Sequence, residues 1–289
     1  MIYFSVIVPN LNTPGVGRTL QSLEEQDFDR SAYEVIVVGM DQHGFVRESE
    51  LVRFDRTEVP LSPAKARNRG ARQARGEVIA FIDADCIARA DWLATLARCF
   101  QDPKVSVVGG GVSFESGGYW TLADNLSMFH EYMIIHPPGQ RQQLPSLNLA
   151  LRRELFEGCG GFDERYPRPA GEDADLTIRL RRGGHLLNFE PAAVVLHSPP
   201  RHHLADLLRH AYYQGKYSTK VDPRHVVEPG LPQLLRTRAG VLLAAPLLAG
   251  AVTLRIFFSH KKLLTYWYTA PAIYLAKIAW CIGAANHPA

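Results

Sequence analysis

Short apolar runs alternate with segments of helical spacing through the first half of the chain. Residues 5–8, 34–38, 78–82 and 105–108 are apolar and predict buried strands. Apolar positions 16, 20 and 23 recur at helical spacing, and further helices are predicted over 61–75 and 91–100. Ser62 is a suitable N-cap for the second of these helices, with Pro63 at its first position.

This regular alternation predicts an α/β fold with an open, mostly parallel sheet covered by helices on both faces. Ligands of such sheets bind beyond the carboxyl ends of the strands. Three predicted strands run directly into polar or glycine-containing segments, which are Pro9-Asn10, Gly39-Met40-Asp41 and Asp83-Ala84-Asp85. We therefore expect these segments to lie near a ligand.

The second half of the chain is less regular. A glycine-rich stretch over 158–171 precedes a predicted helix over 172–182, and an apolar strand over 192–196 ends at His197. A further helix is predicted over 204–217. Two apolar stretches follow a change of composition near Pro229, and they cover 239–254 and 263–285. Pro246 weakens the first stretch as a helix, and Lys277 interrupts the second.

The composition indicates a folded protein with a core, and the charges are unevenly distributed along the chain. The chain is 46% hydrophobic and 21% charged, and its net charge of +3 is too small to indicate nucleic acid binding. The last acidic residue is Glu228. The 61 residues after it carry only basic charges, at Arg236, Arg238, Arg255, Lys261, Lys262 and Lys277. A basic, apolar tail favours a helical hairpin in the cytoplasmic face of a membrane, and two core helices under the catalytic domain are the alternative.

The cysteines and the N-terminus point to the cytosol. Cys86, Cys99, Cys159 and Cys281 form no Cys-x-x-Cys pair, so neither a zinc site nor a disulfide framework is expected. The first residues lack the basic region and cleavage site of a signal peptide and predict a strand instead.

Asp83 and Asp85 follow an apolar strand at positions i and i+2, a spacing that lets two carboxylates address one ligand. Hard oxygen ligands suit Mg²⁺ or Mn²⁺, which usually also bind substrate phosphates. An acidic turn without function is one alternative. A phosphatase or a nucleotidyltransferase that uses the same carboxylates is another.

Five blocks together resemble the family 2 glycosyltransferases of the GT-A fold. They are residues 5–12 (SVIVPNLN), 65–70 (KARNRG), 76–85 (GEVIAFIDAD), 160–164 (GGFDE) and 171–176 (GEDADL). The resemblance covers roughly residues 2–220. It implies a Rossmann-like GT-A fold and an inverting, metal-dependent glycosyltransferase of the hexosyltransferase type that uses a nucleotide sugar and Mn²⁺ or Mg²⁺.

The resemblance also assigns roles to single residues. Those expected to bind the nucleotide sugar are Pro9, Asn10, Asn12, Lys65, Arg67, Asn68, Asp83, Ala84 and Asn148. Asp85 and His197 are the expected metal ligands. Asp173 is the expected general base, with Glu172 beside it in the acidic pair. Capping and the helix dipole are the structural alternative for this pair.

Two departures from the family pattern limit these implications. Gly39-Met40 stands where the family has an acidic pair that contacts the base and ribose, so a UDP-sugar is favoured only loosely, and Asp41 is a candidate replacement. The Gln-x-x-Arg-Trp motif of processive polymerases is absent, because Gln214-Gly215-Lys216-Tyr217 does not match it. Transfer of a single sugar is therefore expected. A non-catalytic GT-A module that binds nucleotide or glycan as a scaffold is the alternative.

We therefore expect a GT-A domain over 1–225, with a nucleotide half over 1–113 and an acceptor half over 114–225. A membrane-associated, basic, apolar C-terminal segment is expected over 226–289. The predicted acceptor is a glycan or a lipid-linked molecule of the cell envelope.

Overall fold

A computed structural model describes residues 2–114, 118–218 and 237–287. The chain divides into two compact units. The first comprises Met1–Ser113 and Tyr132–Pro199, and the second comprises Phe114–Glu131 and Pro200–Ala289.

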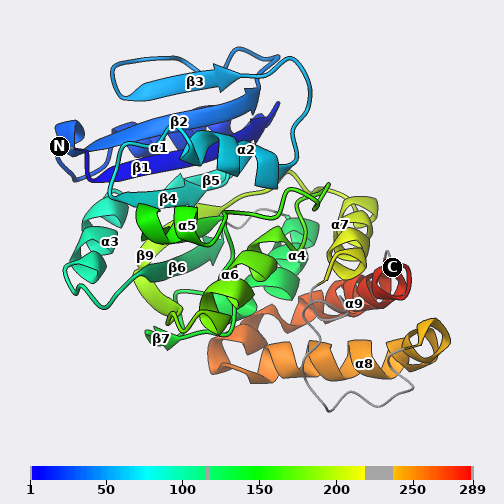
Figure 1. Ribbon diagram of the computed structural model, residues 1–289. Coiled ribbons are helices and arrows are strands. Elements are labelled where there is room, and N and C mark those ends of the chain that lie inside the picture. The colour runs from blue at the N-terminus through cyan, green and yellow to red at the C-terminus, as the bar shows by residue number, and fades with distance from the viewer. Residues whose placement is uncertain (1, 115–117, 219–236, 288–289) are drawn as a thin grey trace. The chain divides into compact units, whose positions relative to one another are not determined.

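A nine-stranded sheet forms the centre of the first unit, and Figure 1 shows β1 between β2 and β4. The strands along the sheet are β3 (Val52–Arg56), β2 (Tyr33–Met40), β1 (Phe4–Leu11), β4 (Val78–Ile82), β8 (Asn148–Arg152), β6 (Val107–Phe114), β9 (Asn188–His197) and β5 (Cys86–Ala88), with the short β7 (Gly139–Gln140) paired to β9. Pairing is parallel from β3 to β4, whereas β8 runs antiparallel to both β4 and β6. The predicted α/β fold is confirmed, but the sheet is mixed and not mostly parallel, because its parallel part comprises β3, β2, β1 and β4.

The helices of the first unit follow the predicted order, with α5 (Arg153–Gly158) in addition to those predicted. They are α1 (Val16–Glu24), α2 (Pro63–Ala71), α3 (Trp92–Phe100), α5 and α6 (Glu172–Arg182), with the 3₁₀ turn η1 at Arg30–Ala32. Ser62 caps α2 by accepting a hydrogen bond from the Lys65 N–H, and Pro63 begins the helix, as predicted. The helix ends at Ala71 and not at residue 75. At Gly70 an added Cβ would lie 2.6 Å from Cγ2 of Ile7, so this glycine lets α2 pack closely on β1.

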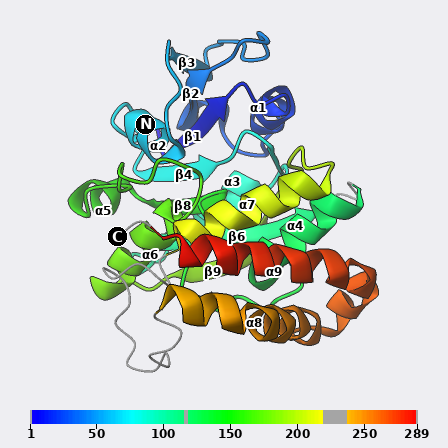
Figure 2. The same cartoon turned by 90° about the vertical axis from the view of Figure 1, so that its right-hand side faces the viewer.

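The second unit is helical. It contains α4 (Tyr119–Phe129), α7 (Leu204–Lys216), α8 (Arg238–Phe258), the 3₁₀ segment η4 (Lys261–Thr269) and α9 (Ala270–Ala285), while a short turn, η2 (His130–Tyr132), joins the units. Figure 2 shows α9 between α7 and α8. Two glycines bring α7 and α9 into backbone contact: an added Cβ at Gly215 would lie 1.9 Å from the Trp280 carbonyl oxygen, and one at Gly283 would lie 1.9 Å from that of Tyr212. Neither position accepts a side chain.

One expectation for this region needs correction. Pro246 does not end the helix, because α8 continues through it and packs Val241 and Ala245 against α9. The predicted domain boundary between 225 and 226 lies outside the described residues. Helices α4 and α7, assigned to the catalytic domain from sequence, group with the C-terminal helices because α9 packs on both.

Candidate active site

Three of the residues predicted to bind the nucleotide sugar lie at the end of β1 or just after it. The Asn10 side chain donates to the Met40 carbonyl oxygen at 2.9 Å and accepts from the Thr13 N–H at 3.1 Å. Asn12 has a positive φ of 55°, and its side-chain oxygen accepts from the Gln42 N–H at 2.8 Å. Pro9 lies within β1 and is partly buried. These hydrogen bonds fix the loops that follow β1 and β2 at the carboxyl edge of the sheet.

Gly39 occupies the first of the two positions at the end of β2 where the resemblance leads us to expect an acidic pair. Its φ is 133°, and an added Cβ would lie 1.9 Å from the Asn10 carbonyl oxygen, so the position excludes a side chain. The nearby carboxylate is that of Asp41, which is buried. Its Oδ2 accepts from the Val46 N–H at 2.7 Å, while its Oδ1 has no hydrogen-bond partner among the described residues. A buried oxygen without a donor marks a position where a ligand N–H could bind.

Arg67 joins two of the predicted acidic groups. Its side chain is 2% exposed, and it contacts Asp83 Oδ1 at 2.6 Å and Glu172 Oε1 at 2.9 Å. The three residues come from α2, from the turn after β4 and from the start of α6. Burial disfavours the charge on Arg67, but Asp83 and Glu172 outweigh it and raise the arginine pKa above its usual range. The arginine is therefore a fixed cation inside the site.

Both members of the acidic pair at the start of α6, Glu172 and Asp173, have a raised pKa. Burial and the neighbouring Asp173 raise the pKa of Glu172 to about 7, although Arg67 acts in the opposite direction. Burial also raises the pKa of Asp173. The two oxygens of Asp173 accept backbone N–H groups from Ser146 at 3.2 Å and from Ala174 at 2.7 Å, which fixes the orientation of the carboxylate.

Asp85, in the turn before β5, lies beside His197 at the end of β9. Asp85 Oδ1 lies 3.7 Å from His197 Nε2, and β5 pairs with β9 so that Cys86 lies opposite His197. Ligand atoms of Asp85, Cys86 and His197 all lie within 4.8 Å of one another. A carboxylate and an imidazole at this separation suit a divalent ion such as Mn²⁺. Burial raises the pKa of the Cys86 thiol well above its usual value.

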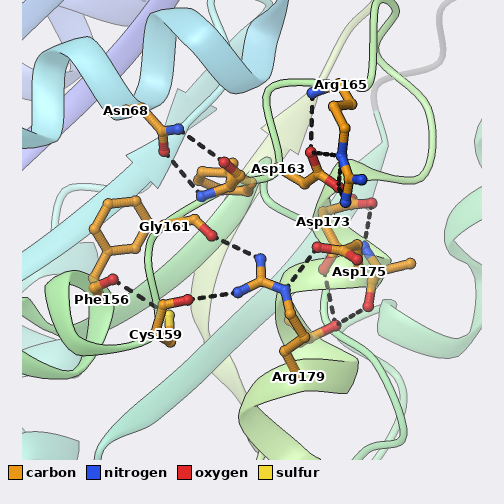
Figure 3. A network of polar contacts seen from close by, with 12 residues as sticks. Asn68, Phe156, Cys159, Gly161, Asp163, Arg165, Asp173, Asp175 and Arg179 are labelled. Carbon is orange, nitrogen blue, oxygen red and sulfur yellow. Dashed lines mark hydrogen bonds and ion pairs between the residues drawn. The ribbon is translucent and has the colours of Figure 1, made fainter. Parts of the chain in front are cut away.

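Asn68 holds a loop in place. Its side chain accepts from the Phe162 N–H at 2.9 Å and donates to the Phe162 carbonyl oxygen at 2.8 Å. Figure 3 shows this pair of bonds beside Arg179, whose guanidinium donates to the carbonyl oxygens of Cys159 at 2.8 Å and Gly161 at 2.7 Å. Arg179 also pairs with Asp175 at 2.8 Å. The glycine-rich loop is therefore tied to both α2 and α6, and these bonds set the position of the acidic pair.

Three remaining predictions fall at structurally different positions. Asn148 is completely buried: its side chain accepts from Trp92 Nε1 at 2.9 Å and donates to two carbonyl oxygens, of Gly111 and Ala193. Both polar atoms of the amide are bonded within the core, and the expected role of Asn148 near the sugar stays a prediction. Ala84 is buried, and its carbonyl oxygen accepts from the Thr19 hydroxyl at 2.9 Å, whereas Lys65 is exposed.

Sequence reasoning did not identify Arg179 or the backbone of Ser146 as parts of this site. The spacing of Asp175 and Arg179, at i and i+4 of one helix, predicts their ion pair, but nothing local indicates that the same guanidinium binds the loop. A backbone N–H leaves no signal in the side-chain pattern at all.

Comparison with known proteins identifies the family of this chain. Residues 5–158 match the family model described as glycosyl transferase family 2. Glycosyltransferase AglE of Haloferax volcanii is 26% identical over 76% of this chain and 74% of its own length. The pre-mycofactocin glycosyltransferase of Mycobacterium tuberculosis is 33% identical over 63% of this chain, which spans only 39% of that enzyme.

A similar fold occurs in the mannosyltransferase PcManGT of Pyrobaculum calidifontis, solved with GDP-Man and Mn²⁺. Its TM-score is 0.61 at 22% identity, with 94% of this chain and 85% of that one covered. The family model covers more than half of the chain and includes the first three of the five sequence blocks, among them the one that ends in Asp83-Ala84-Asp85. The resemblance to the family is therefore confirmed. The chain belongs to the family 2 glycosyltransferases.

Proposed function

We propose that this glycosyltransferase moves one sugar, with inversion, from a nucleotide-diphosphate donor to a hydroxyl of a glycan or lipid-linked acceptor. The observation that carries the proposal is the buried chain of contacts from Asp83 through Arg67 to Glu172. These contacts link Asp83, the carboxylate expected on the donor side, to the acidic pair Glu172-Asp173 at the start of α6. An inverting transfer needs both groups in one site, because the base acts on the face opposite the departing diphosphate.

Asp173 is the proposed general base. It is less buried than Glu172, and its backbone hydrogen bonds orient it. Its raised pKa makes the ionised carboxylate a stronger proton acceptor for the attacking hydroxyl. Glu172 is occupied by Arg67, so we assign it to positioning.

Asp85 and His197 are the proposed ligands of a divalent ion, with Mn²⁺ favoured over Mg²⁺ by the imidazole. Such an ion supplies Lewis-acid stabilisation of the departing diphosphate. Asp83 is not proposed as a metal ligand, because its Oδ1 contacts Arg67. The expected partner of Asp83 is the ribose of the donor.

Asp41 gives a basis for nucleotide preference. Its unpartnered Oδ1 can accept a hydrogen bond from a ring N–H, which uracil and guanine carry and which adenine and cytosine lack. We therefore favour UDP or GDP donors over ADP or CDP. Catalysis at the cytoplasmic face of a membrane is part of the proposal, on account of the apolar, basic C-terminal helices.

The experiment is a thermal-shift panel of UDP, GDP, ADP and CDP, with Mn²⁺ and with chelator, followed by transfer or hydrolysis assays with matching nucleotide sugars. We expect stabilisation by UDP or GDP that chelator removes. Turnover should be lost in Asp173→Asn with nucleotide binding retained. Binding without turnover across all donors would favour a scaffold module, and pyrophosphate release would favour a nucleotidyltransferase; either result overturns the proposal.

A further inference from the structure

Helix α8 exposes an unbroken apolar stripe. Leu243 and Leu247 are 77% and 80% exposed, and Phe258 at the end of the helix is 71% exposed. The stripe, which we call the α8 stripe, comprises Leu243, Leu247, Ala251, Leu254 and Phe258. Spacings of four, four, three and four residues place all five on one face of a helix. A stripe of this length facing water is unusual for a soluble protein and marks an interaction surface.

Basic and aromatic side chains continue from the end of the stripe. Phe258 lies 6.5 Å from Trp267 of η4, measured between ring centroids, and both Trp267 and Tyr268 are exposed. Lys261 and Lys262 at the start of η4 are also exposed. Arg255 is exposed as well, with Glu131 of the same unit 3.6 Å away. No acidic residue occurs in the sequence after Glu228, so the charge of this region complements an anionic surface.

The packing of the inner side of α8 argues against a membrane crossing. By length and composition, α8 is the one helix in the described ranges that could span a bilayer. Its inner side, however, packs against α9 through Val241 and Ala245. Helix α9 is in turn held to α7 by the Gly215 and Gly283 contacts, and Lys277 of α9 donates to the Ser127 carbonyl oxygen of α4 at 2.7 Å.

Helix α7 carries charged surface residues such as Arg209, which is 70% exposed on its side chain. A spanning α8 would draw α9 and these charges into hydrocarbon, at a large cost. A helix that lies flat immerses only the stripe.

We propose that α8 lies in the plane of an anionic bilayer surface, with the α8 stripe and Trp267 immersed and Lys261 and Lys262 against lipid phosphates. This extends the membrane part of the proposed function, and vesicle binding without sugar donor tests it separately from catalysis. The occupant is a lipid surface and not a second copy of the chain, because the exposed Lys261 and Lys262 that follow the stripe complement anionic lipid phosphates.

The test is sedimentation of the full chain with neutral phosphatidylcholine vesicles and with vesicles that also contain phosphatidylglycerol. We expect the anionic vesicles to bind more protein, with binding that falls as salt rises. The double variant Leu243→Ser/Leu247→Ser should bind at least about 100-fold more weakly. Leu186→Ser changes an exposed leucine of the first unit, at 54%, and should bind like the wild type.

A second variant distinguishes a loss of membrane binding from misfolding. Lys261→Gln/Lys262→Gln changes only exposed groups and should weaken binding to anionic vesicles about 10- to 30-fold at low salt, with little effect on neutral ones. Extraction with alkaline carbonate should release the wild type. Retention after carbonate would show that α8 crosses the bilayer, and a dimer in light scattering that the Leu243→Ser/Leu247→Ser variant abolishes would assign the stripe to a second copy. Either result, or equal binding by Leu186→Ser and the double leucine variant, overturns the proposal.

Discussion

Glu172 should make the stability of the protein depend on pH in a predictable direction. Its pKa is about 7 in the folded chain and 4.5 in the reference state, so the folded protein holds this proton more tightly than the unfolded chain does. Such a carboxyl group does not change the free energy of unfolding while it is protonated in both the folded and the unfolded state. It lowers the free energy of unfolding progressively as pH rises from about 4.5 through 7. At about 1.4 kcal/mol per pH unit, the full cost is roughly 3 kcal/mol, and about 2 to 3 kcal/mol of it develops between pH 5 and pH 8.

Glu172→Gln removes the titration and keeps the shape. The stability of this variant relative to the wild type should therefore rise by about 2 to 3 kcal/mol from pH 5 to pH 8, whatever its value at pH 5. Urea denaturation at both pH values, in the presence of chelator, measures the difference. Glu157→Gln is the matched control, because that side chain is 55% exposed, and it should change little. An unchanged difference for Glu172→Gln would refute the reasoning that burial and Asp173 disfavour the Glu172 charge.

Other predictions test the remaining features. Asp85→Ala should abolish the extra thermal stabilisation that Mn²⁺ adds to nucleotide, because one of two proposed metal ligands is lost; an undiminished metal effect would place the ion elsewhere. Gly283→Ala should cost about 2 kcal/mol or more in unfolding free energy, since its Cβ would lie 1.9 Å from a carbonyl oxygen, while Gly250→Ala, with open space around it, should be neutral or stabilising by the same measurement. Asn148→Ala should lower the free energy of unfolding by about 2 to 4 kcal/mol in urea denaturation, because it leaves buried carbonyl and indole groups unpaired. A selective rise in the KM for the donor, with stability unchanged, would instead support the predicted contact of Asn148 with the sugar.

Long, regular elements were predictable, and their physical basis is local. The sequence pattern located β4 and α6 to the residue, because an apolar run of five and a helix with acidic first and basic last turns are complete signals in themselves. Short strands such as β3 and β5 were not predicted. β3 mixes Arg and Asp with apolar residues, and β5 is three residues long, so only their neighbours in the sheet define them.

The polar residues of the site divide in the same way. The residue types and spacing of Asp83, Asp85 and Asp173 are enough by themselves to indicate carboxylate chemistry. The duties of Asn68 and Asn148 depend on partners about 94 and 56 residues away in the chain, which no local pattern specifies. The same holds for Arg67, which looks like one member of a basic helix face until Glu172, 105 residues further on, is seen beside it.

The glycine contacts between α7 and α9 have a practical consequence for making this protein in soluble form. Deleting everything after residue 236 would remove the apolar α8, but it would also strip the surface of α7 on which Gly215 meets the Trp280 carbonyl, and it would take away the Lys277 contact with α4. A truncated chain would thus exchange one exposed apolar surface for another. Polar substitutions confined to the α8 stripe, with α9 left intact, are the better route to a soluble form.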